Sequence, residues 1–275
     1  MIIDGRKIAE EIIEELKKKR KPQKFLSAFL VGENPASENF LLKKKETAEK
    51  LKIDFRVYCF PETISQDDLR KEVLKISLNK RCGGVIIQLP LPAKINPQYI
   101  MNAVPREKDV DVLGERALGA FYVGRNPILP PAVATVEKIL SGLDFDFSGC
   151  SATVVGLGTL VGKPVSVWLM GKTKEIFLLD KGSDLSTLRN ADLVIFGTGD
   201  PQLVKPEMLR EDAIVIDFGY GSIAGKVFGD FDDSSLKTNN PQSETISYTP
   251  TPGGTGPILV AELFANFFTL LEPKE

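Results

Sequence analysis

Short apolar runs alternate with helical patterns along the first half of the chain. The runs have the length of buried strands, and the segments between them repeat apolar positions every three or four residues, as amphipathic helices do. Strands are predicted at residues 25–31, 53–60 and 84–89, and helices at residues 37–51, 65–78 and 96–104. A loop rich in Pro, Arg and Gly follows at residues 105–131. This alternation predicts a parallel sheet covered by helices.

A second series of the same kind fills the other half. It begins after a helical stretch at residues 132–140 and ends in a strong helical pattern at residues 255–271. Strands are predicted at residues 152–155, 176–179, 193–196 and 214–218, and a helix at residues 164–170. The expected fold class is therefore α/β, with two domains and a cleft between them, and such clefts are favoured ligand sites.

Composition and charge narrow the function classes. The 275 residues are 43% hydrophobic and 26% charged, as in globular proteins. No apolar run approaches the ~20 residues of a membrane span. The first residues lack the pattern of a signal peptide, so we expect a cytoplasmic protein. A net charge of −2 gives no global attraction to nucleic acid or to an anionic membrane.

The residue types also restrict the chemistry. The chain has no histidine, which excludes Ser–His and Cys–His triads and His-ligated metal sites, and we expect no metal. Cys59, Cys82 and Cys150 lie far apart without a Cys-x-x-Cys pair, which indicates reduced, buried thiols. Catalysis must then rest on Lys, Asp, Gln or a cofactor.

A glycine-rich turn at residues 156–162 follows a predicted strand and opens a helix. Gly156, Gly158 and Gly162 are spaced Gly-x-Gly-x-x-x-Gly, one residue longer than the usual dinucleotide fingerprint. Glycines permit the tight turn and let the backbone approach a pyrophosphate at the helix N-terminus. The motif is weak by itself, because glycines mark many strand-to-helix turns.

The context of this turn strengthens the interpretation. Asp180 ends the next strand, 24 residues after Gly156, where a carboxylate can accept hydrogen bonds from a ribose. The third strand ends in the small-residue turn Gly197-Thr198-Gly199. Together these features predict that NAD or NADP binds here. Asp180 favours NAD because it repels a 2′-phosphate, but Lys181 beside it offsets that repulsion, so the choice stays open.

Residues of the first half form a second candidate site. Asn34 and Pro35 predict the start of a helix, on which Ser37, Phe40 and Lys44 share one face. An aromatic ring and an ammonium group so placed suit a flat substrate with a polar edge. The pattern by itself, however, favours a structural role, in which Phe40 packs in the core and the lysines at residues 43–45 form a solvated charged face.

Three further polar residues extend this candidate site. Gln88 lies at the carboxyl end of an apolar run, where α/β folds bind ligands, although a structural role is also open. Asp109 and Asp111 lie in the loop that joins the two halves, where acids are more often merely exposed.

Ordered sequence blocks connect all of these features. They lie at residues 3–5, 31–37, 84–92, 108–111, 161–164, 213–219 and 229–230. The most specific block is Tyr-Thr-Pro-Thr-Pro-Gly-Gly-Thr-Gly-Pro at residues 248–257. Over nearly its whole length the chain resembles the bifunctional methylenetetrahydrofolate dehydrogenase/cyclohydrolase family, known as FolD.

The resemblance implies both a fold and a reaction. Residues 1–131 would form an α/β folate-binding domain, with the C-terminal helix 256–275 packing back on it, and residues 132–255 a Rossmann-type dinucleotide-binding domain. The family is typically a homodimer, and its habitual cofactor is NADP. It oxidises 5,10-methylenetetrahydrofolate to the methenyl compound with NAD(P)⁺, then hydrolyses that compound to 10-formyltetrahydrofolate.

Roles follow for the residues that match the family. Lys44 would be the catalytic lysine, Gln88 would hydrogen-bond it, and Asp111 would anchor the pterin ring. The substrate pocket would also include Ser37, Phe40, Pro252, Gly253 and Gly254. The dinucleotide would contact Gly156, Leu157, Gly158, Gly162, Asp180, Thr198 and Tyr220.

Three departures from the family fall on the folate side. Phe40 replaces Tyr and lacks its hydroxyl, Val112 replaces Gly and restricts a turn, and Pro-Pro-Ala-Val at residues 130–133 replaces Pro-Cys-Thr-Pro. We therefore hypothesise a weakened cyclohydrolase or an altered folate preference. Dehydrogenase activity should suffer less, because hydride transfer depends chiefly on positioning.

Two alternatives remain at this point. One is a catalytically silent dinucleotide- or folate-binding paralogue, although the retention of Lys44, Gln88 and Asp111 argues against it. The other is a two-domain dehydrogenase for another small substrate, which leaves the blocks around residues 88–90 and 252–254 unexplained.

Overall fold

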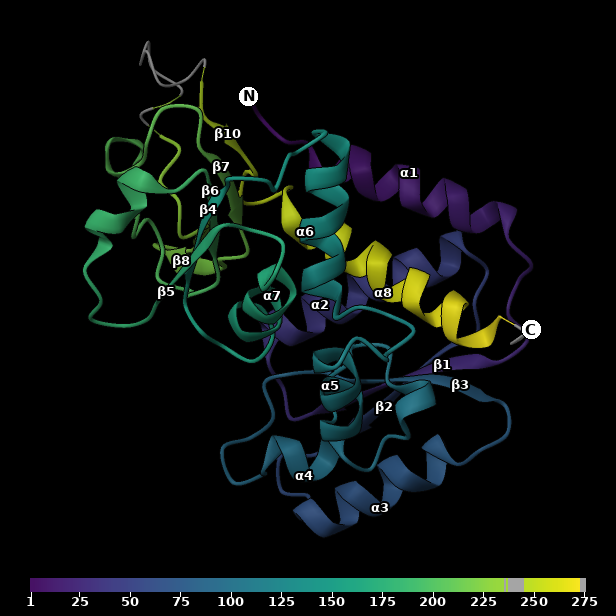
Figure 1. Ribbon diagram of the computed structural model, residues 1–275. Helices are drawn as coiled ribbons and strands as arrows, with labels where there is room; N and C mark the ends of the chain where they lie inside the picture. The colour runs from purple at the N-terminus through teal and green to yellow at the C-terminus, as the bar shows by residue number, and fades with distance from the viewer. Residues whose placement is uncertain (235, 237–244, 273–275) are drawn as a thin grey trace. The chain divides into compact units, whose positions relative to one another are not determined.

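The computed structural model describes residues 1–234, 236 and 245–272, and it divides into two compact units, each described by itself (Figure 1). The three-stranded unit comprises residues 10–131 and 260–272, and the five-stranded unit comprises residues 1–9 and 132–259. Helices α1 (Gly5–Lys18) and α8 (Thr255–Leu271) each begin in the five-stranded unit and continue into the three-stranded unit.

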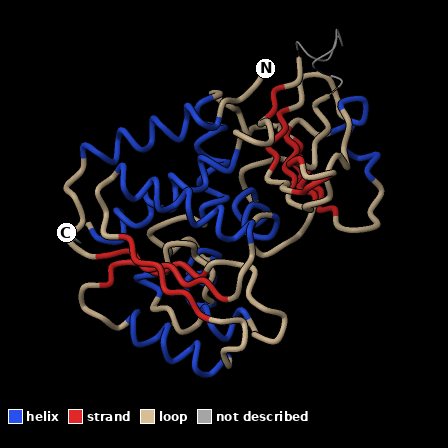
Figure 2. Tube along the Cα trace, turned by 180° about the vertical axis from the view of Figure 1, so that it is seen from behind, coloured by secondary structure: helices blue, strands red, loops and turns tan. Residues whose placement is uncertain are grey.

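Parallel strands in the order β2-β1-β3 form the sheet of the three-stranded unit. The strands are β1 (Phe25–Val31), β2 (Phe55–Phe60) and β3 (Cys82–Ile87). Every residue of β1 and β3 is buried, because a parallel sheet has helices on both faces, and this is why both runs are apolar without alternation. Helix α3 (Gln66–Ser77) lies on one side of the sheet and α2 (Pro35–Lys50) on the other (Figures 1 and 2).

The predicted strands and helices of this unit are confirmed to within a few residues, and strand 25–31 has the predicted bounds. The predicted loop at residues 105–131 is wrong in part. It contains a short 3₁₀ helix (Arg106–Lys108) and α5 (Glu115–Tyr122), and α4 (Pro97–Met101) precedes it. The buried residues of α5 are Ala117 and Ala120, too few to produce a helical period in the sequence.

The five-stranded unit contains a wholly parallel sheet in the order β10-β7-β6-β4-β5. Its strands are β4 (Ser151–Val155), β5 (Glu175–Leu179), β6 (Leu193–Phe196), β7 (Ile214–Asp217) and β10 (Ser247–Tyr248). Its helices include α6 (Pro131–Gly142), which starts at the unit boundary, and α7 (Gly162–Leu169). Two short 3₁₀ helices (Leu185–Asn190 and Pro206–Met208) complete it. Sequence reasoning missed β10 and the hairpin of β8 (Gly221–Ile223) and β9 (Lys226–Phe228), which are too short to form a pattern.

The strand order locates the ligand edge of this sheet. Counted along the chain from β4, the order reads 2-1-3-4-5 from the β5 edge, as in flavodoxin-like doubly wound sheets. The chain first moves outward from β4 to β5 and then crosses back to β6. The carboxyl ends of β4 and β6 therefore flank the topological switch point, where such sheets bind ligands.

The first residues of the chain pair with the far edge of the same sheet. The backbone N–H of Ile3 donates to the carbonyl of Tyr248 at 2.8 Å, and the Tyr248 N–H donates to the carbonyl of Met1 at 3.0 Å. A Cβ on Gly5 would lie 1.7 Å from the carbonyl oxygen of Gly254. The blocks at residues 3–5 and 248–257 are thus two sides of one contact, in which only glycine fits at position 5.

Candidate functional site

Helix α2 carries three of the predicted site residues. The Asn34 side chain caps it by accepting from the Ser37 N–H at 3.0 Å, and Pro35 occupies its first turn, as the sequence predicts. Ser37 is buried, whereas Phe40 and Lys44 are half-buried. The ammonium of Lys43 lies 5.6 Å from the centre of the Phe40 ring. The helix therefore holds Ser37, Phe40 and Lys44 on one face at fixed spacing.

Lys44 and Gln88 form a directed hydrogen bond. Lys44 Nζ donates to Gln88 Oε1 at 3.0 Å, while Gln88 Nε2 donates to the Leu89 carbonyl at 2.9 Å. Ser37 Oγ donates to the same carbonyl at 3.3 Å. Because the Gln88 amide nitrogen is held by Leu89, the amide oxygen must face Lys44. Gln88 directly follows the last residue of β3, so the end of this strand fixes the position of the residue that pairs with Lys44.

The charges of Lys44 and Asp111 act on one another. Burial lowers the pKa of the Lys44 ammonium, and the negative charge of Asp111 partly opposes that change. Burial raises the pKa of the Asp111 carboxyl, and the positive charge of Lys44 opposes that shift. A lysine whose pKa is lowered by burial can lose and regain a proton nearer to neutral pH, which is what acid–base catalysis requires.

Asp109 organises the loop that carries Asp111. It is buried beside Val85 of β3, and its carboxylate accepts from the backbone N–H groups of Leu113 and Gly114 at 3.0 and 2.8 Å. Burial raises the pKa of Asp109 to about 6. Both acids also line a small cavity of about 10 Å³. The sequence does not distinguish this structural acid from its neighbour two positions later.

Val112, the second departure from the family, has a left-handed backbone conformation with φ of 56°. Its side chain is fully buried in a small apolar cluster with Ala117 and Ile128. The conformation that glycine adopts most easily is therefore kept here by a β-branched residue. The expected restriction takes the form of backbone strain, and burial of the side chain offsets it.

The glycine turn of the five-stranded unit lies at the switch point. Gly156 has φ of 88°, and a Cβ there would lie 2.7 Å from the carbonyl oxygen of Gly197, at the end of β6. A Cβ on Gly162 would lie 1.9 Å from the carbonyl oxygen of Gly156. Gly158 is exposed, with open space around its Cβ position. The close-packed glycines and the open one form a cradle suited to a pyrophosphate at the start of α7.

The remaining predicted dinucleotide residues lie at neighbouring positions of this unit. Leu157 is half-buried, and Thr198 and Tyr220 are exposed. Asp180 is exposed directly after β5, and its side chain accepts from the Lys181 N–H at 2.9 Å. Asp180 thus stands at the strand end where an acid would meet a ribose, and Lys181 follows it as the sequence requires.

The turn from Pro250 to Gly254 also belongs to the five-stranded unit. Gly253 has φ of 110°, and the Gly254 N–H donates to the Pro250 carbonyl at 2.7 Å. Pro252 is exposed and follows a cis peptide bond. A Cβ on Gly254 would lie 2.6 Å from the Pro250 carbonyl oxygen. Both glycines are therefore required by the shape of this turn.

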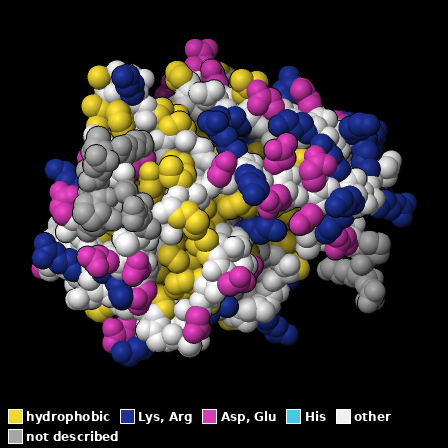
Figure 3. Space-filling model, turned by 90° about the horizontal axis from the view of Figure 1, so that it is seen from above, with side chains coloured by type: hydrophobic (Ala, Val, Ile, Leu, Met, Phe, Trp, Pro, Cys, Tyr) yellow, Lys and Arg dark blue, Asp and Glu magenta, His cyan; other side chains and the backbone are white. Residues whose placement is uncertain are grey.

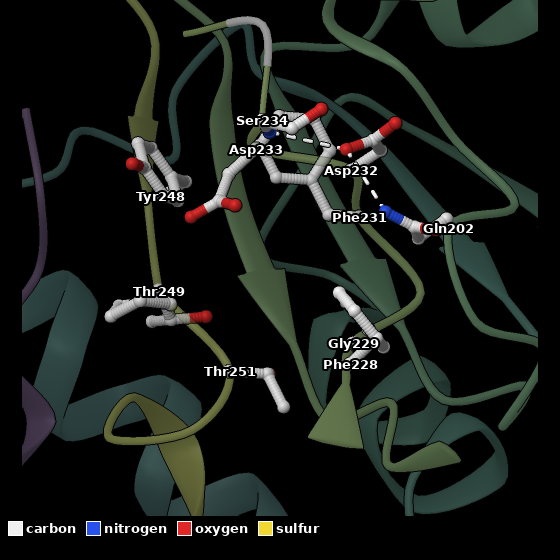
Figure 4. A pocket seen from close by; sticks show the side chains of 11 residues that line it. Gln202, Phe228, Gly229, Phe231, Asp232, Asp233, Ser234, Tyr248, Thr249 and Thr251 are labelled. Atoms are coloured by element: carbon white, nitrogen blue, oxygen red, sulfur yellow. Dashed lines mark hydrogen bonds between the residues drawn. The ribbon is translucent and has the colours of Figure 1, made fainter. Parts of the chain in front are cut away.

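A cavity of about 170 Å³ lies beside this turn (Figure 4). Gln202 and Asp232 point toward each other on one side of it, joined by a hydrogen bond of 3.2 Å. Tyr248, Thr249 and Thr251 line the other side. None of these residues was singled out from the sequence as a separate site.

The cysteines and the surface charges agree only in part with what the sequence predicts. All three cysteines are free, but Cys59 on β2 is exposed, so the expectation that every thiol is buried is wrong there. Basic and acidic side chains intermingle over the face in Figure 3. Among the described residues, no cluster of His, Cys, Asp or Glu could hold a metal, and no helix could span a membrane.

A parallel sheet with a glycine cradle at its switch point defines an α/β dinucleotide-binding protein, and comparison with known families identifies which one. The model of the tetrahydrofolate dehydrogenase/cyclohydrolase catalytic domain matches residues 3–111. That of the family's NAD(P)-binding domain matches residues 130–275. The chain belongs to this family of bifunctional enzymes, and its second domain binds NAD(P).

Individual relatives agree with the family models. The bifunctional protein FolD of a Sulfurihydrogenibium species is 33% identical, with 100% of this chain and 98% of the relative aligned. A crystal structure of the Campylobacter jejuni FolD enzyme is 30% identical, covers 98% of both chains and has a TM-score of 0.92. The Trypanosoma brucei enzyme, complexed with NADP and an inhibitor, is 26% identical, covers 98% and 97%, and has a TM-score of 0.90. Nothing in these comparisons favours a catalytically silent paralogue.

Proposed function

We propose that this chain oxidises 5,10-methylenetetrahydrofolate with NAD(P)⁺ and then hydrolyses the product to 10-formyltetrahydrofolate. The observation that carries the proposal is the Lys44–Gln88 hydrogen bond, fixed by the Leu89 carbonyl at the end of β3. The titratable amine of Lys44 is held by the neutral Gln88 side chain, and the charge of Asp111 acts on it. The chain in which this occurs belongs to the dehydrogenase/cyclohydrolase family.

The first reaction is a hydride transfer. The methylene carbon loses a hydride and becomes the methenyl cation, and bound NAD(P)⁺ accepts that hydride at its nicotinamide ring. We assign Asp111 to the pterin N–H groups, because a half-buried carboxylate is a strong acceptor for them. The Phe40 ring offers a flat apolar surface for the substrate, and Ser37 lines the same face of α2.

The second reaction adds water to the methenyl carbon and opens the ring. Water forms a bond to the methenyl carbon and loses both of its protons as the formyl C=O forms. One proton goes to the ring nitrogen whose bond to that carbon breaks, and the other is released to solvent, which accounts for the positive charge of the methenyl substrate. We assign this proton movement to Lys44, whose pKa is lowered by burial. Gln88 Oε1 accepts a hydrogen bond from Lys44 Nζ, so the remaining hydrogens of Nζ, or its lone pair after deprotonation, point in other directions.

The dinucleotide is assigned to the glycine cradle. The backbone from Gly156 to Gly162 would receive the pyrophosphate, with Leu157 and Gly158 against it, and Asp180 would contact the adenosine ribose. Thr198 and Tyr220 would border the cofactor at the ends of β6 and β7. Pro252, Gly253 and Gly254 would shape the substrate site, where their backbone allows close approach.

The folate-side departures lead to a finer proposal. The loss of the Tyr hydroxyl at Phe40, the strained Val112 and the altered stretch at residues 130–133 should weaken the cyclohydrolase more than the dehydrogenase. A purified protein with normal cyclohydrolase turnover and little dehydrogenase activity would contradict this ordering.

Organisation and assembly complete the proposal. We assign the folate-binding domain to residues 1–131 with the C-terminal helix 256–275, whose last three residues lie outside the described part of the chain, and the dinucleotide-binding domain to residues 132–255. We also propose a cytoplasmic homodimer. The edge strand β5 supports dimerisation, because its apolar Leu178 side chain is 45% exposed.

The test is an assay of both activities on the wild-type protein and on Lys44→Ala. Wild type with methylenetetrahydrofolate and NAD or NADP should yield reduced nicotinamide, and with methenyltetrahydrofolate it should consume the substrate. Lys44→Ala should lose cyclohydrolase activity by about 100-fold or more. Its neighbour Lys45→Ala, one position away and exposed, is the matched control and should retain it. Unchanged activity in Lys44→Ala would remove this lysine from the mechanism.

A further inference from the structure

A buried carboxylate holds the second glycine turn of the dinucleotide edge. Asp230 is fully buried, and one of its oxygens, Oδ2, accepts three hydrogen bonds from the turn that follows β6. The Thr198 N–H donates at 2.7 Å, the Thr198 hydroxyl at 2.8 Å and the Gly199 N–H at 3.3 Å. A single side chain therefore fixes both the backbone and the hydroxyl of this turn.

This turn also forms one wall of the glycine cradle. Its first residue, Gly197, lies directly against Gly156 of the glycine cradle, where a Cβ would be only 2.7 Å from the Gly197 carbonyl oxygen. The Thr198 hydroxyl also accepts from the Asp200 N–H at 3.0 Å. A shift of residues 197–199 would therefore move the wall of the cradle, and the Asp230 carboxylate opposes that shift.

A second acid, Asp217, holds Asp230 in place. Asp217 is buried at the end of β7, and its carboxylate accepts from the Gly219 N–H at 2.6 Å and from the Phe231 N–H at 3.0 Å. A Cβ on Gly219 would lie 2.2 Å from Asp230 Oδ1, and a Cβ on Gly229 would lie 2.0 Å from Asp217 Oδ2. Each carboxylate thus occupies the space that a side chain on the other acid's neighbouring glycine would need.

Asp230 and the two residues that follow it lie in different surroundings. Phe231 and Asp232 line the cavity of Figure 4, whereas Asp230 is not among its lining residues. Asp232 accepts from Gln202 Nε2 at 3.2 Å and from the Ser234 N–H at 3.1 Å, so it has a similar hydrogen-bonding load without touching the turn. This contrast supplies a matched control two residues from Asp230.

From this geometry we propose that Asp230 is a positioning residue of the dinucleotide site, which holds the Gly197–Gly199 turn in the shape that receives the cofactor. The inference rests on the proposed function, because it assumes that the dinucleotide lies at the switch point of the five-stranded sheet. The proposed role of Asp230 concerns only the binding of NAD(P)⁺, which takes part in the dehydrogenase reaction. The cyclohydrolase step uses no dinucleotide, so that activity serves as an internal measure of correct folding.

Two substitutions at Asp230 distinguish its effect on the shape of the Gly197–Gly199 turn from its effect on the stability of the fold. Asp230→Ala removes the acceptor of all three hydrogen bonds. Asp230→Asn keeps one amide oxygen for them, and its NH₂ group would take the place of Oδ1, which accepts no hydrogen bond from any described residue. The Asn variant is therefore the conservative rescue.

The experiment measures KM and kcat for NAD(P)⁺, cyclohydrolase kcat and the melting temperature in wild type, both Asp230 variants and Asp232→Ala. We expect Asp230→Ala to raise the KM for NAD(P)⁺ by about tenfold or more, with cyclohydrolase kcat within about twofold of wild type. Asp230→Asn should recover most of this affinity, and Asp232→Ala should leave the KM unchanged.

Other outcomes overturn the inference. An unchanged KM in Asp230→Ala does so, and so does a parallel loss of both activities in Asp230→Asn, which would indicate a purely structural role. If Asp230→Ala does not fold, Asp230→Ser decides, since its small polar side chain is too short to hold the three donors, and it should still raise the KM without lowering cyclohydrolase kcat. A wild-type protein that reduces neither dinucleotide would instead refute the proposed function itself.

Discussion

Val112 offers a quantitative test of how this chain accommodates its departures from the family. The residue is fully buried against Ala117 and Ile128, yet its φ of 56° lies in the region that favours glycine. Val110, two positions earlier, is equally buried, and its backbone lies outside that region. Comparing the same substitutions at Val110 and Val112 therefore separates the free-energy cost of losing a buried side chain from the cost of the left-handed backbone.

The quantity to compare is the change in unfolding free energy between the Ala and the Gly variant at each position. At Val110 this step removes one buried methyl group, worth about 0.8 kcal/mol, and adds the entropy cost of glycine, roughly 0.5–1 kcal/mol. The Gly variant should therefore be about 1.5 kcal/mol less stable than the Ala variant. At Val112 the same step also relieves a left-handed conformation worth roughly 1–2 kcal/mol, so the difference should be close to zero.

Urea unfolding of the four variants, followed by far-UV circular dichroism, measures both differences. The single tryptophan, Trp168, lies in the five-stranded unit and reports that unit separately by fluorescence. A difference at Val112 as large as that at Val110 would refute the strain argument. If this strain also weakens the cyclohydrolase, Val112→Gly should raise its kcat, and an unchanged kcat would show that the turn is not responsible.

Three further predictions concern charge. Gln88→Glu places a carboxylate against Lys44, so the pKa of the ammonium should rise and the pH profile of cyclohydrolase activity should shift upward by about one unit or more; an unmoved profile contradicts the assigned pairing. Burial raises the pKa of Asp109 from 3.8 to about 6, so the folded state keeps a proton that the unfolded state releases, and stability should fall as pH rises from about 4 to about 6, by up to roughly 3 kcal/mol. Urea midpoints at pH 4.5 and 7.5 should show a loss that is larger in wild type than in Asp109→Asn by about this amount, whereas equal losses would contradict it. The loss that remains in Asp109→Asn comes from other buried acids such as Asp217, whose pKa burial raises to about 7. Asp180→Ser should increase the ratio of kcat/KM for NADP to that for NAD by about tenfold, and an unchanged ratio would show that Asp180 does not meet the ribose.

The sequence predicted best those features that depend on local pattern. Strand β1 and helix α8 have the predicted bounds, because a continuous apolar run and a long helical period are both strong signals. The Asn34 cap was predictable for the same reason, since its partner lies three residues away. Gln88 was placed correctly at the end of β3, because the carboxyl end of a buried parallel strand is itself a pattern.

Features that depend on contacts distant in sequence were not predictable. The interlocked acids Asp217 and Asp230 belong to recognised blocks, but nothing local shows that Asp230 reaches the turn at Thr198. Gly5 is required by the carbonyl of Gly254, near the other end of the chain. The left-handed backbone of Val112 contradicts the preference of valine, so only tertiary packing could impose it.

Isotope transfer tests the central claim most directly. The purified protein is mixed with methylenetetrahydrofolate carrying two deuterium atoms on the bridging carbon and with NAD⁺ or NADP⁺, and the folate and nicotinamide products are analysed by mass spectrometry. The account predicts one deuterium on the reduced nicotinamide for each methenyl group formed, followed by 10-formyltetrahydrofolate that retains the other. Reduced nicotinamide without deuterium, or no reduction with either dinucleotide, would contradict it.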